Sequence, residues 1–335
     1  MHNLLDPAIL FFVIGVVAGT VKSNLEIPHA ISRFLALYLL MALGLKGGFA
    51  LSHSGLTASV GASLAAAVFL AVCIPLLGYW ILRRFVSGFD AAAVAATYGS
   101  VSAVSFVTAV QYLENQQLPY GGHMAAAMAL MESPAIIMAV VLANALRQKA
   151  SSGLIALGGG VAGLSAQPVR QGGALGKILH ESFTDGAQLL LLGAMVVGLL
   201  TGDAGKVAMQ PFSGDLFKGM LAFFLLDMGL LAARNFPPAQ ARSHVLIAYA
   251  VLGPILHASL ALGLAFLLKL PTGDGVLLMV LAASASYIAV PAVLRHALPE
   301  SNPALYFGLS LGVTFPMNIM VGIPVYTAVA RAVLH

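Results

Sequence analysis

The sequence predicts an all-α polytopic membrane protein with about ten transmembrane helices, because it is strongly apolar, poor in charge and divided into runs of membrane-spanning length. Hydrophobic residues make up 60% of the chain and charged residues 8%, and the mean hydropathy is +0.95. A soluble domain carries about a quarter charged residues, so lipid must be the solvent of this chain. The apolar runs long enough to cross about 30 Å of hydrocarbon fall at 7–22, 29–51, 58–82, 90–112, 122–146, 183–202, 211–233, 243–268, 274–297 and 304–331.

Two proline-containing stretches, Leu130–Met138 and Leu311–Met320, resemble one another and lie about half the chain apart. In each stretch a polar residue stands two positions before the proline, Glu132 in the first and Thr314 in the second. Each stretch also follows a serine-rich segment. A membrane protein built twice, with an interrupted polar segment at the same place in both halves, is typical of secondary transporters.

The repeat predicts how the chain is organised. Residues 1–150 and 179–335 form two five-helix repeats, joined by a flexible linker at 151–178 that is rich in Gly, Ala and Ser. Because five spans per half is an odd number, the two repeats must have opposite orientations in the membrane.

The positions of Lys and Arg predict the orientation, since these residues collect in cytoplasmic connections. With the N-terminus outside, the larger share of the 16 basic residues falls on the cytoplasmic side. These residues are Lys22, Arg33, Arg83, Arg84, Arg147, Lys149, Arg170, Lys177, Arg234, Arg242 and Arg295. We therefore expect a multi-pass protein of the bacterial inner (plasma) membrane with both termini external and the linker in the cytoplasm.

The two serine-rich segments are predicted to be broken helices, since irregular backbone at membrane depth is tolerated where it lines a cavity. Two half-helix N-termini facing one another would bind a small anion through free N–H groups and Ser hydroxyls. The predicted substrate-binding residues are Gly99, Ser100, Ser102, Ser105, Ser284, Ser286 and Tyr287. The alternative is that Ser and Gly only allow close helix packing.

Three residues are candidates for ion coupling. Glu132 lies well inside the fifth apolar run, where an ionisable group is costly and indicates an ion path or a partner. Its alternative role is to cap backbone freed by the nearby proline. Asp227 is also intramembrane, and a helix–helix hydrogen bond there is as good an explanation as a cation site. Thr314 is included because it occupies the repeat position of Glu132.

Other site classes are excluded by the motifs. The histidines are scattered without HExxH or CxxC partners, so no metal site is expected. The single cysteine, Cys73, allows no internal disulfide. No nucleophile–base set or nucleotide fingerprint is present, which argues against an enzyme. The net charge of +4 reflects residues flanking spans rather than a nucleic-acid surface.

The chain resembles the sodium-dependent bicarbonate transporter family. The matching stretches are Leu25–Ile31, Gly44–Gly48, Leu118–Tyr120, Met131–Pro134, Val141–Asn144 and Ser301–Tyr306. The resemblance implies ten helices in two inverted repeats, a core and a gate domain, and a homotrimer. It also implies bicarbonate held between the broken fourth and ninth helices, with Na⁺ beside it. The short linker does not indicate the PII-like cytoplasmic regulator found with some members of the family.

The resemblance is uneven at the site. Gly99, Ser102 and Ser105 fit the family's fourth-helix segment, and Ser284 and Ser286 fit its ninth-helix segment. Tyr287, however, stands where the family has an Asp, the natural carboxylate ligand for sodium, and a phenol is a far weaker ligand.

We therefore expect a secondary-active transporter of a small anion, bicarbonate first, by alternating access, with Na⁺ as the candidate coupling ion. One alternative keeps the fold and carries another small anion or organic acid with proton or no coupling. Another alternative is a transport-inactive membrane sensor or scaffold.

Overall fold

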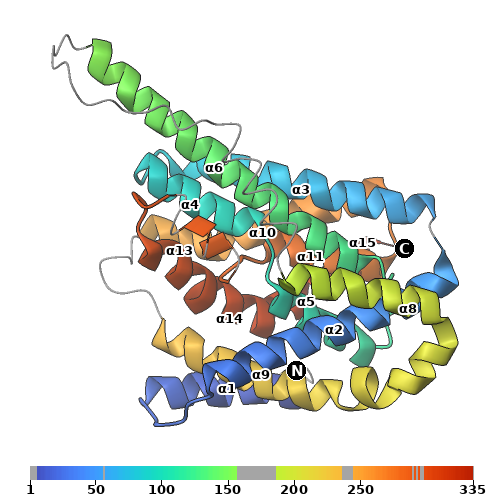
Figure 1. Cartoon of the computed structure of the whole chain (residues 1–335). Helices are drawn as coiled ribbons and strands as arrows, with labels where there is room; N and C mark the ends of the chain where they lie inside the picture. The colour runs from blue at the N-terminus through green and yellow to red at the C-terminus, as the bar shows by residue number, and fades with distance from the viewer. Residues whose placement is uncertain are drawn as a thin grey trace.

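The computed structural model describes residues 6–55, 57–156, 186–235, 244–288, 290–291, 293–294 and 298–334, and no strand occurs among them (Figure 1). The helices are α1 (Pro7–Thr20), α2 (His29–Ser54), α3 (Ala58–Leu82), α4 (Gly88–Gly99), α5 (Ala103–Asn115), α6 (Met124–Ala156), α8 (Gly186–Gln210), α9 (Phe217–Arg234), α10 (His244–Leu267), α11 (Thr272–Ala283), α13 (Pro303–Leu309), α14 (Phe315–Met317) and α15 (Ile323–Val333). Short π-helical segments occupy Pro211–Asp215, Ser310–Thr314 and Asn318–Gly322. The predicted all-helical class is confirmed for this part of the chain.

Six stretches of the described residues are long and apolar enough to cross a membrane. They are His29–His53, Ala58–Leu82, Gly88–Asn115, Gly186–Arg234, His244–Leu267 and Pro303–Val333. One of them, Gly186–Arg234, has 49 residues and covers the predicted run at 211–233 together with residues 186–202 of the run before it. Two further apolar helices, α1 and α11, have 14 and 12 residues, fewer than the roughly 20 that a straight span needs.

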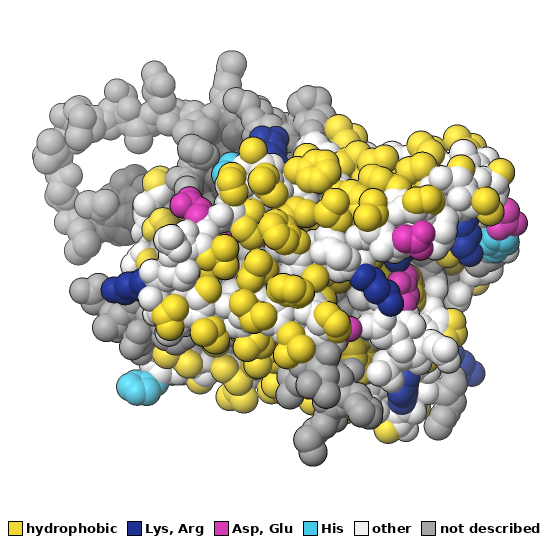
Figure 2. All heavy atoms as spheres, turned by 90° about the horizontal axis from the view of Figure 1, so that it is seen from below, with side chains coloured by type: hydrophobic (Ala, Val, Ile, Leu, Met, Phe, Trp, Pro, Cys, Tyr) yellow, Lys and Arg dark blue, Asp and Glu magenta, His cyan; other side chains and the backbone are white. Residues whose placement is uncertain are grey.

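The surface agrees with a lipid environment. Figure 2 shows hydrophobic side chains spread across much of one face, with charged side chains at its left edge and over its right-hand part. Large apolar side chains are exposed on the outer helices, among them Leu200 at 80% and Leu252 at 62%. A soluble monomer rarely exposes so extensive an apolar surface.

Four helices form a group that we call the paired-helix group, in which α1 packs along α9 and α2 packs along α8. Glycines allow both contacts. A Cβ on Gly15 of α1 would lie 2.2 Å from the carbonyl oxygen of Leu226 in α9, and one on Gly48 of α2 would lie 2.1 Å from that of Met195 in α8. Small residues let membrane helices approach this closely, and the contact is then made by backbone.

The remaining helices form the broken-helix group, in which α3 packs on α4 and α6, and α10 packs on α11. A proline interrupts the regular α-helix in the C-terminal stretch of this group. Pro316 cannot donate the backbone hydrogen bond that an α-helix needs, and π-helical turns lie on both sides of it. Pro134 lies inside α6, as the repeat predicts.

The predicted linker at 151–178 overlaps the end of α6, which continues to Ala156. The rest of the linker lies outside the described residues.

The close contact at Gly48 predicts a loss of stability on substitution. Gly48→Ala is expected to destabilise the fold by about 1–3 kcal/mol, because the added methyl group meets backbone that cannot move aside. Gly61→Ala in α3 is the matched control, since nothing lies within 4 Å of its added Cβ. Thermal unfolding in detergent measures both, and equal midpoints for the two variants would contradict the packing.

Candidate functional site

Both serine-rich segments leave the helix where the sequence predicts. α4 ends at Gly99, Ser100 and Ser102 have extended backbone, and α5 begins at Ala103. In the second half α11 ends at Ala283, and Ser284 is extended, with φ −83° and ψ 165°. A continuous helix would have excluded a site here. The breaks free backbone groups that need partners within the protein.

The two breaks supply partners to each other. The Ser102 N–H donates to the Ser284 hydroxyl oxygen at 3.0 Å, and the Ser286 N–H donates to the Thr97 carbonyl at 2.9 Å. The Ser284 hydroxyl in turn donates to the carbonyl of Leu281 at 2.9 Å. The structure therefore brings together two segments from opposite halves of the chain and fixes them by reciprocal hydrogen bonds.

A serine hydroxyl accepts a hydrogen bond from a backbone N–H group just after each break. The Ser102 hydroxyl oxygen accepts from the Ser105 N–H at 3.2 Å and from the Ser105 hydroxyl at 3.1 Å. The Ser286 hydroxyl oxygen accepts from the Val290 N–H at 3.3 Å. The first N–H groups of a helix have no intrahelical partner. In α5 these belong to Ala103 and Val104, which both line a cavity.

This cavity has a volume of 670 Å³ and lies between the two helix groups. Helices α2 and α8 of the paired-helix group form one wall, and α5, α6 and Ser286–Ile288 form the other. Its lining is mostly apolar. The polar side chains on it are Arg33, Ser102, Glu132, Gln188, Ser286 and Tyr287.

The cavity is open at one end. Arg33, Gly186 and Ile288 are exposed there, and we call this end the mouth. Val107 and Met128, also on the lining, are 2% and 4% exposed.

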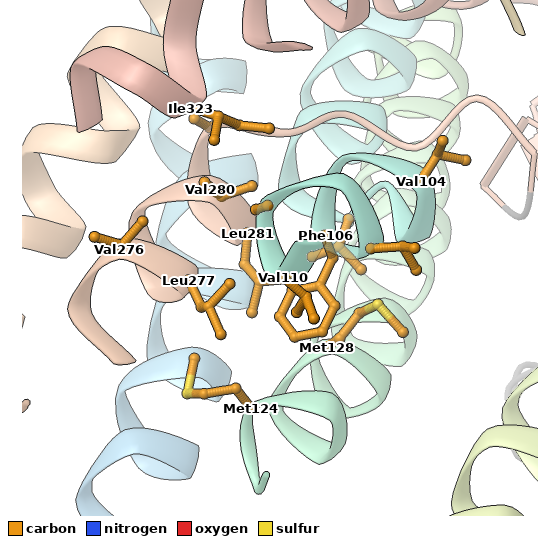
Figure 3. Close-up of a cluster of buried hydrophobic side chains, with 14 of the residues drawn as sticks. Val104, Phe106, Val110, Met124, Met128, Val276, Leu277, Val280, Leu281 and Ile323 are labelled. Atoms are coloured by element: carbon orange, nitrogen blue, oxygen red, sulfur yellow. The ribbon is translucent and has the colours of Figure 1, made fainter. Parts of the chain in front are cut away.

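Beyond the break the half-helices pack tightly. Figure 3 shows apolar side chains that converge between α5, α6, α11 and α15. The labelled members are Val104, Phe106, Val110, Met124, Met128, Val276, Leu277, Val280, Leu281 and Ile323, all at most 4% exposed. The packing closes the path from the break toward the end of α5.

The predicted binding residues divide into two sets. Ser102, Ser286 and Tyr287 line the cavity. The others lie just behind it. Gly99 packs against Pro75, whose ring would be 2.6 Å from an added Cβ. Ser100 is buried, and its hydroxyl has no hydrogen-bond partner among the described atoms. Ser105 and Ser284 hold the crossing, as given above.

Tyr287 is held by its ring and its hydroxyl. The ring packs edge-on against Phe315 with 5.4 Å between centroids. The hydroxyl donates to the sulfur of Met228 in α9 at 3.6 Å. A phenol that contacts the paired-helix group thus occupies the position where the family resemblance implies a carboxylate.

Of the three ion-coupling candidates, the structure places Glu132 on the cavity. Its carboxylate accepts from the Gln188 side-chain amide at 2.7 Å. Asp227 accepts a hydrogen bond from the Ser32 hydroxyl, which joins α9 to α2. Thr314 is fully buried and donates to the Ala250 carbonyl at 2.7 Å. Asp227 and Thr314 do not line the cavity.

Asn318 is a polar residue at the break that the sequence interpretation missed. Its side-chain amide donates to the Ala283 carbonyl at 2.8 Å, and its oxygen accepts from the Tyr326 hydroxyl at 3.1 Å. It therefore satisfies the carbonyl at the last residue of α11. An amide in an apolar run, four residues after Thr314, was the signal that could have revealed it.

Comparison with known proteins identifies the family of the chain. No curated protein matches the chain. A family model described as the Na⁺-dependent bicarbonate transporter superfamily matches residues 7–331. This match confirms the resemblance seen in the sequence and assigns the chain to transporters rather than enzymes. The chain belongs to the Na⁺-dependent bicarbonate transporter superfamily.

Proposed function

We propose that the chain carries bicarbonate across a membrane by alternating access, with the anion bound where the two broken helices cross. The observation that supports this most is the cavity between two helix groups at the crossing. Ala103 and Val104, at the N-terminal end of α5, line it, and the first N–H groups of a helix, which have no intrahelical partner, stabilise anions.

The chemistry of the lining suits a small oxyanion that carries one proton. Bicarbonate has oxygen atoms that accept hydrogen bonds and one O–H that donates. The Ser102 and Ser286 hydroxyls can do either. Arg33, exposed at the mouth, adds a positive charge that attracts anions. The rest of the lining is apolar, which strengthens each polar contact made inside.

We propose ten passes in two inverted repeats, with the broken-helix group as the core and the paired-helix group as the gate. The pairing of α1 with α9 and of α2 with α8 supports this, because each pair takes one helix from each half. Contacts near the ends of the predicted spans also support this topology, because each joins two residues on the same predicted side of the membrane. They are Arg147–Glu300 and Arg234–Leu25 on the cytoplasmic side, and Asp6–Asn115 and His53–Asp203 on the external side. By analogy with the family we propose a homotrimer in the bacterial inner membrane.

The orientation is tested by cysteine labelling in a Cys73→Ser background. With both termini external, Ser165→Cys in the predicted cytoplasmic linker is expected to resist an impermeant maleimide added to intact cells. Gln116→Cys, in the exposed connection after α5, is expected to react readily and serves as the control. Ready labelling at position 165 would overturn the orientation.

The function is tested by uptake of labelled bicarbonate into proteoliposomes, with protein-free vesicles as the control. Saturable uptake that unlabelled bicarbonate suppresses would support the proposal. If another small anion or organic acid suppresses uptake at a lower concentration than unlabelled bicarbonate does, that compound is the favoured cargo. The phenol at Tyr287, in place of the expected carboxylate, supports this alternative. Absence of uptake for every anion would favour a sensor or scaffold.

A further inference from the structure

An ion pair joins the two helix groups at the end of the molecule away from the cavity mouth. The Lys46 ammonium of α2 lies 2.9 Å and 3.1 Å from the two carboxylate oxygens of Glu114, near the end of α5. Along α2, Lys46 follows Arg33 by thirteen residues, about 20 Å at 1.5 Å per residue. The ion pair therefore bridges the groups beyond the closed end of the cavity.

Neighbouring side chains support both partners. The Tyr120 hydroxyl donates to Glu114 at 3.0 Å, and the Lys46 ammonium lies 4.0 Å from the centre of the Phe217 ring in α9. The Lys46 and Glu114 side chains are 19% and 32% exposed. A pair that is partly buried, bidentate and supported by an aromatic ring is stronger than an ordinary surface ion pair.

A second bridge lies beside the first. The Asn115 side-chain amide donates to the carboxylate of Asp6, the residue that precedes α1, at 2.8 Å. The Asn115 oxygen accepts from the Lys218 ammonium of α9 at 3.1 Å. The end of α5 is thus bonded to α2, to α9 and to the start of α1, which are three of the four helices in the paired-helix group.

Backbone packing closes the same region. A Cβ on Gly122, just before α6, would lie 2.1 Å from the carbonyl oxygen of Gly47 in α2. The two backbones therefore touch one residue away from Lys46. This contact leaves little space between the groups at this end.

We propose that the Lys46–Glu114 pair and the Asp6–Asn115–Lys218 contacts form a latch that keeps the cavity closed on this side. The inference rests on the proposed function, since alternating access requires the cavity to close at one end while it is open at the other. Exposing the cavity here requires α5 to separate from α2 and α9, and the latch must then break. A mutation that removes the latch contacts therefore shifts the population toward the state that is open on the latch side.

Charge reversal tests the latch without a transport measurement. In a Cys73→Ser background, Val107→Cys places a reporter at the closed end of the cavity. Arg33→Cys, a separate variant, is labelled from the mouth side and so shows which side of the vesicle membrane the mouth faces. Glu114→Lys or Lys46→Glu puts like charges together. Each is expected to raise the rate at which an impermeant maleimide labels position 107 from the latch side by at least about fivefold. Combining the two reversals restores an opposite-charge pair and is expected to return the rate most of the way to the parental value.

The ion pair of Arg147 and Glu300 provides the matched control. It joins α6 to the connection before α13, both within the broken-helix group, at 2.8 Å. The hydrogen bond from Arg147 lowers the pKa of Glu300 below its ordinary value, so Glu300 is ionised at neutral pH. Glu300→Arg is expected to leave the labelling at position 107 unchanged.

Three results would overturn the latch. They are parental labelling rates in both single reversals, an undiminished rate in the double reversal, and an equal increase in Glu300→Arg. Bicarbonate uptake is measured separately on the same proteins. If labelling responds as expected but no bicarbonate is taken up, the cargo is wrong and the latch stands. If uptake occurs but labelling does not respond, the latch is wrong and the proposed cargo stands.

Discussion

Ser102→Ala is expected to weaken the apparent affinity for bicarbonate about 10- to 100-fold. The Ser102 hydroxyl lies both on the cavity and at the crossing of the broken helices. A hydrogen bond to a charged group contributes about 1.5–3 kcal/mol, and each 1.4 kcal/mol corresponds to about tenfold in affinity. The concentration dependence of labelled bicarbonate uptake into proteoliposomes measures the effect.

Two variants separate anion binding from the structural role of this serine. Ser102→Thr keeps the hydroxyl and is expected to stay close to the parental affinity. Ser63→Ala removes a buried hydroxyl that donates to the Ser59 carbonyl at 2.9 Å in α3, and its affinity is expected to be unchanged. Loss of the helix cap costs about 1 kcal/mol of stability, which the thermal midpoint of Ser102→Ala reports. Parental affinity in this variant would remove Ser102 from the proposed anion site.

The broken helices could be predicted because their cause is local. Serines at membrane depth, at matching positions of two halves, indicate backbone that must leave the helix and find polar partners. Ser100–Ser102 and Ser284–Ser286 do this. The breaks interrupt the predicted spans at 90–112 and 274–297. The family assignment was likewise predictable, because its motifs are spread over nearly the whole chain.

The cavity could not be predicted, because it depends on which helices become neighbours. Membrane helices that are apolar on every side carry no stripe that identifies a partner. The sequence therefore gives no sign that Arg33 and Gln188, from opposite halves, line one cavity wall and that Glu132 lines the wall across from them. Helix ends are also uncertain. Gly202, where a predicted run ends, has a positive φ of 51°, yet helical structure resumes and reaches Gln210.

Carboxylates were the hardest residues to assign, for a related reason. Glu132 and Asp227 look alike in sequence, since each is a lone acid inside an apolar run. Their roles differ only through packing. Asp227 meets the Ser32 hydroxyl across a helix contact, whereas Glu132 reaches the cavity. The structure makes the helix–helix hydrogen bond the simpler explanation of Asp227 and keeps Glu132 as the coupling candidate.

Uptake by the native protein is expected to depend weakly or not at all on sodium, because Tyr287 occupies the position where the family resemblance implies a carboxylate. A carboxylate and bound bicarbonate 4 Å apart would repel by about 4 kcal/mol at an effective dielectric constant of 20, so a cation would have to lie between them. A neutral phenol removes both the repulsion and the strongest sodium ligand. Uptake measured in sodium and in potassium at equal ionic strength tests this expectation.

Tyr287→Asp is expected to introduce sodium stimulation, since it restores a carboxylate beside Ser102 and Ser286 on the cavity lining. The same change removes a ring that packs against Phe315, and losing a buried aromatic ring costs about 3–5 kcal/mol. Tyr287→Phe is therefore the control. It keeps the ring and loses only the hydroxyl that donates to Met228, so it should retain sodium-independent uptake. Strong, saturable stimulation of the native protein by sodium over potassium would show that other ligands hold the ion. It would overturn this account of Tyr287 and leave the fold intact, and Glu132 would become the first carboxylate to test.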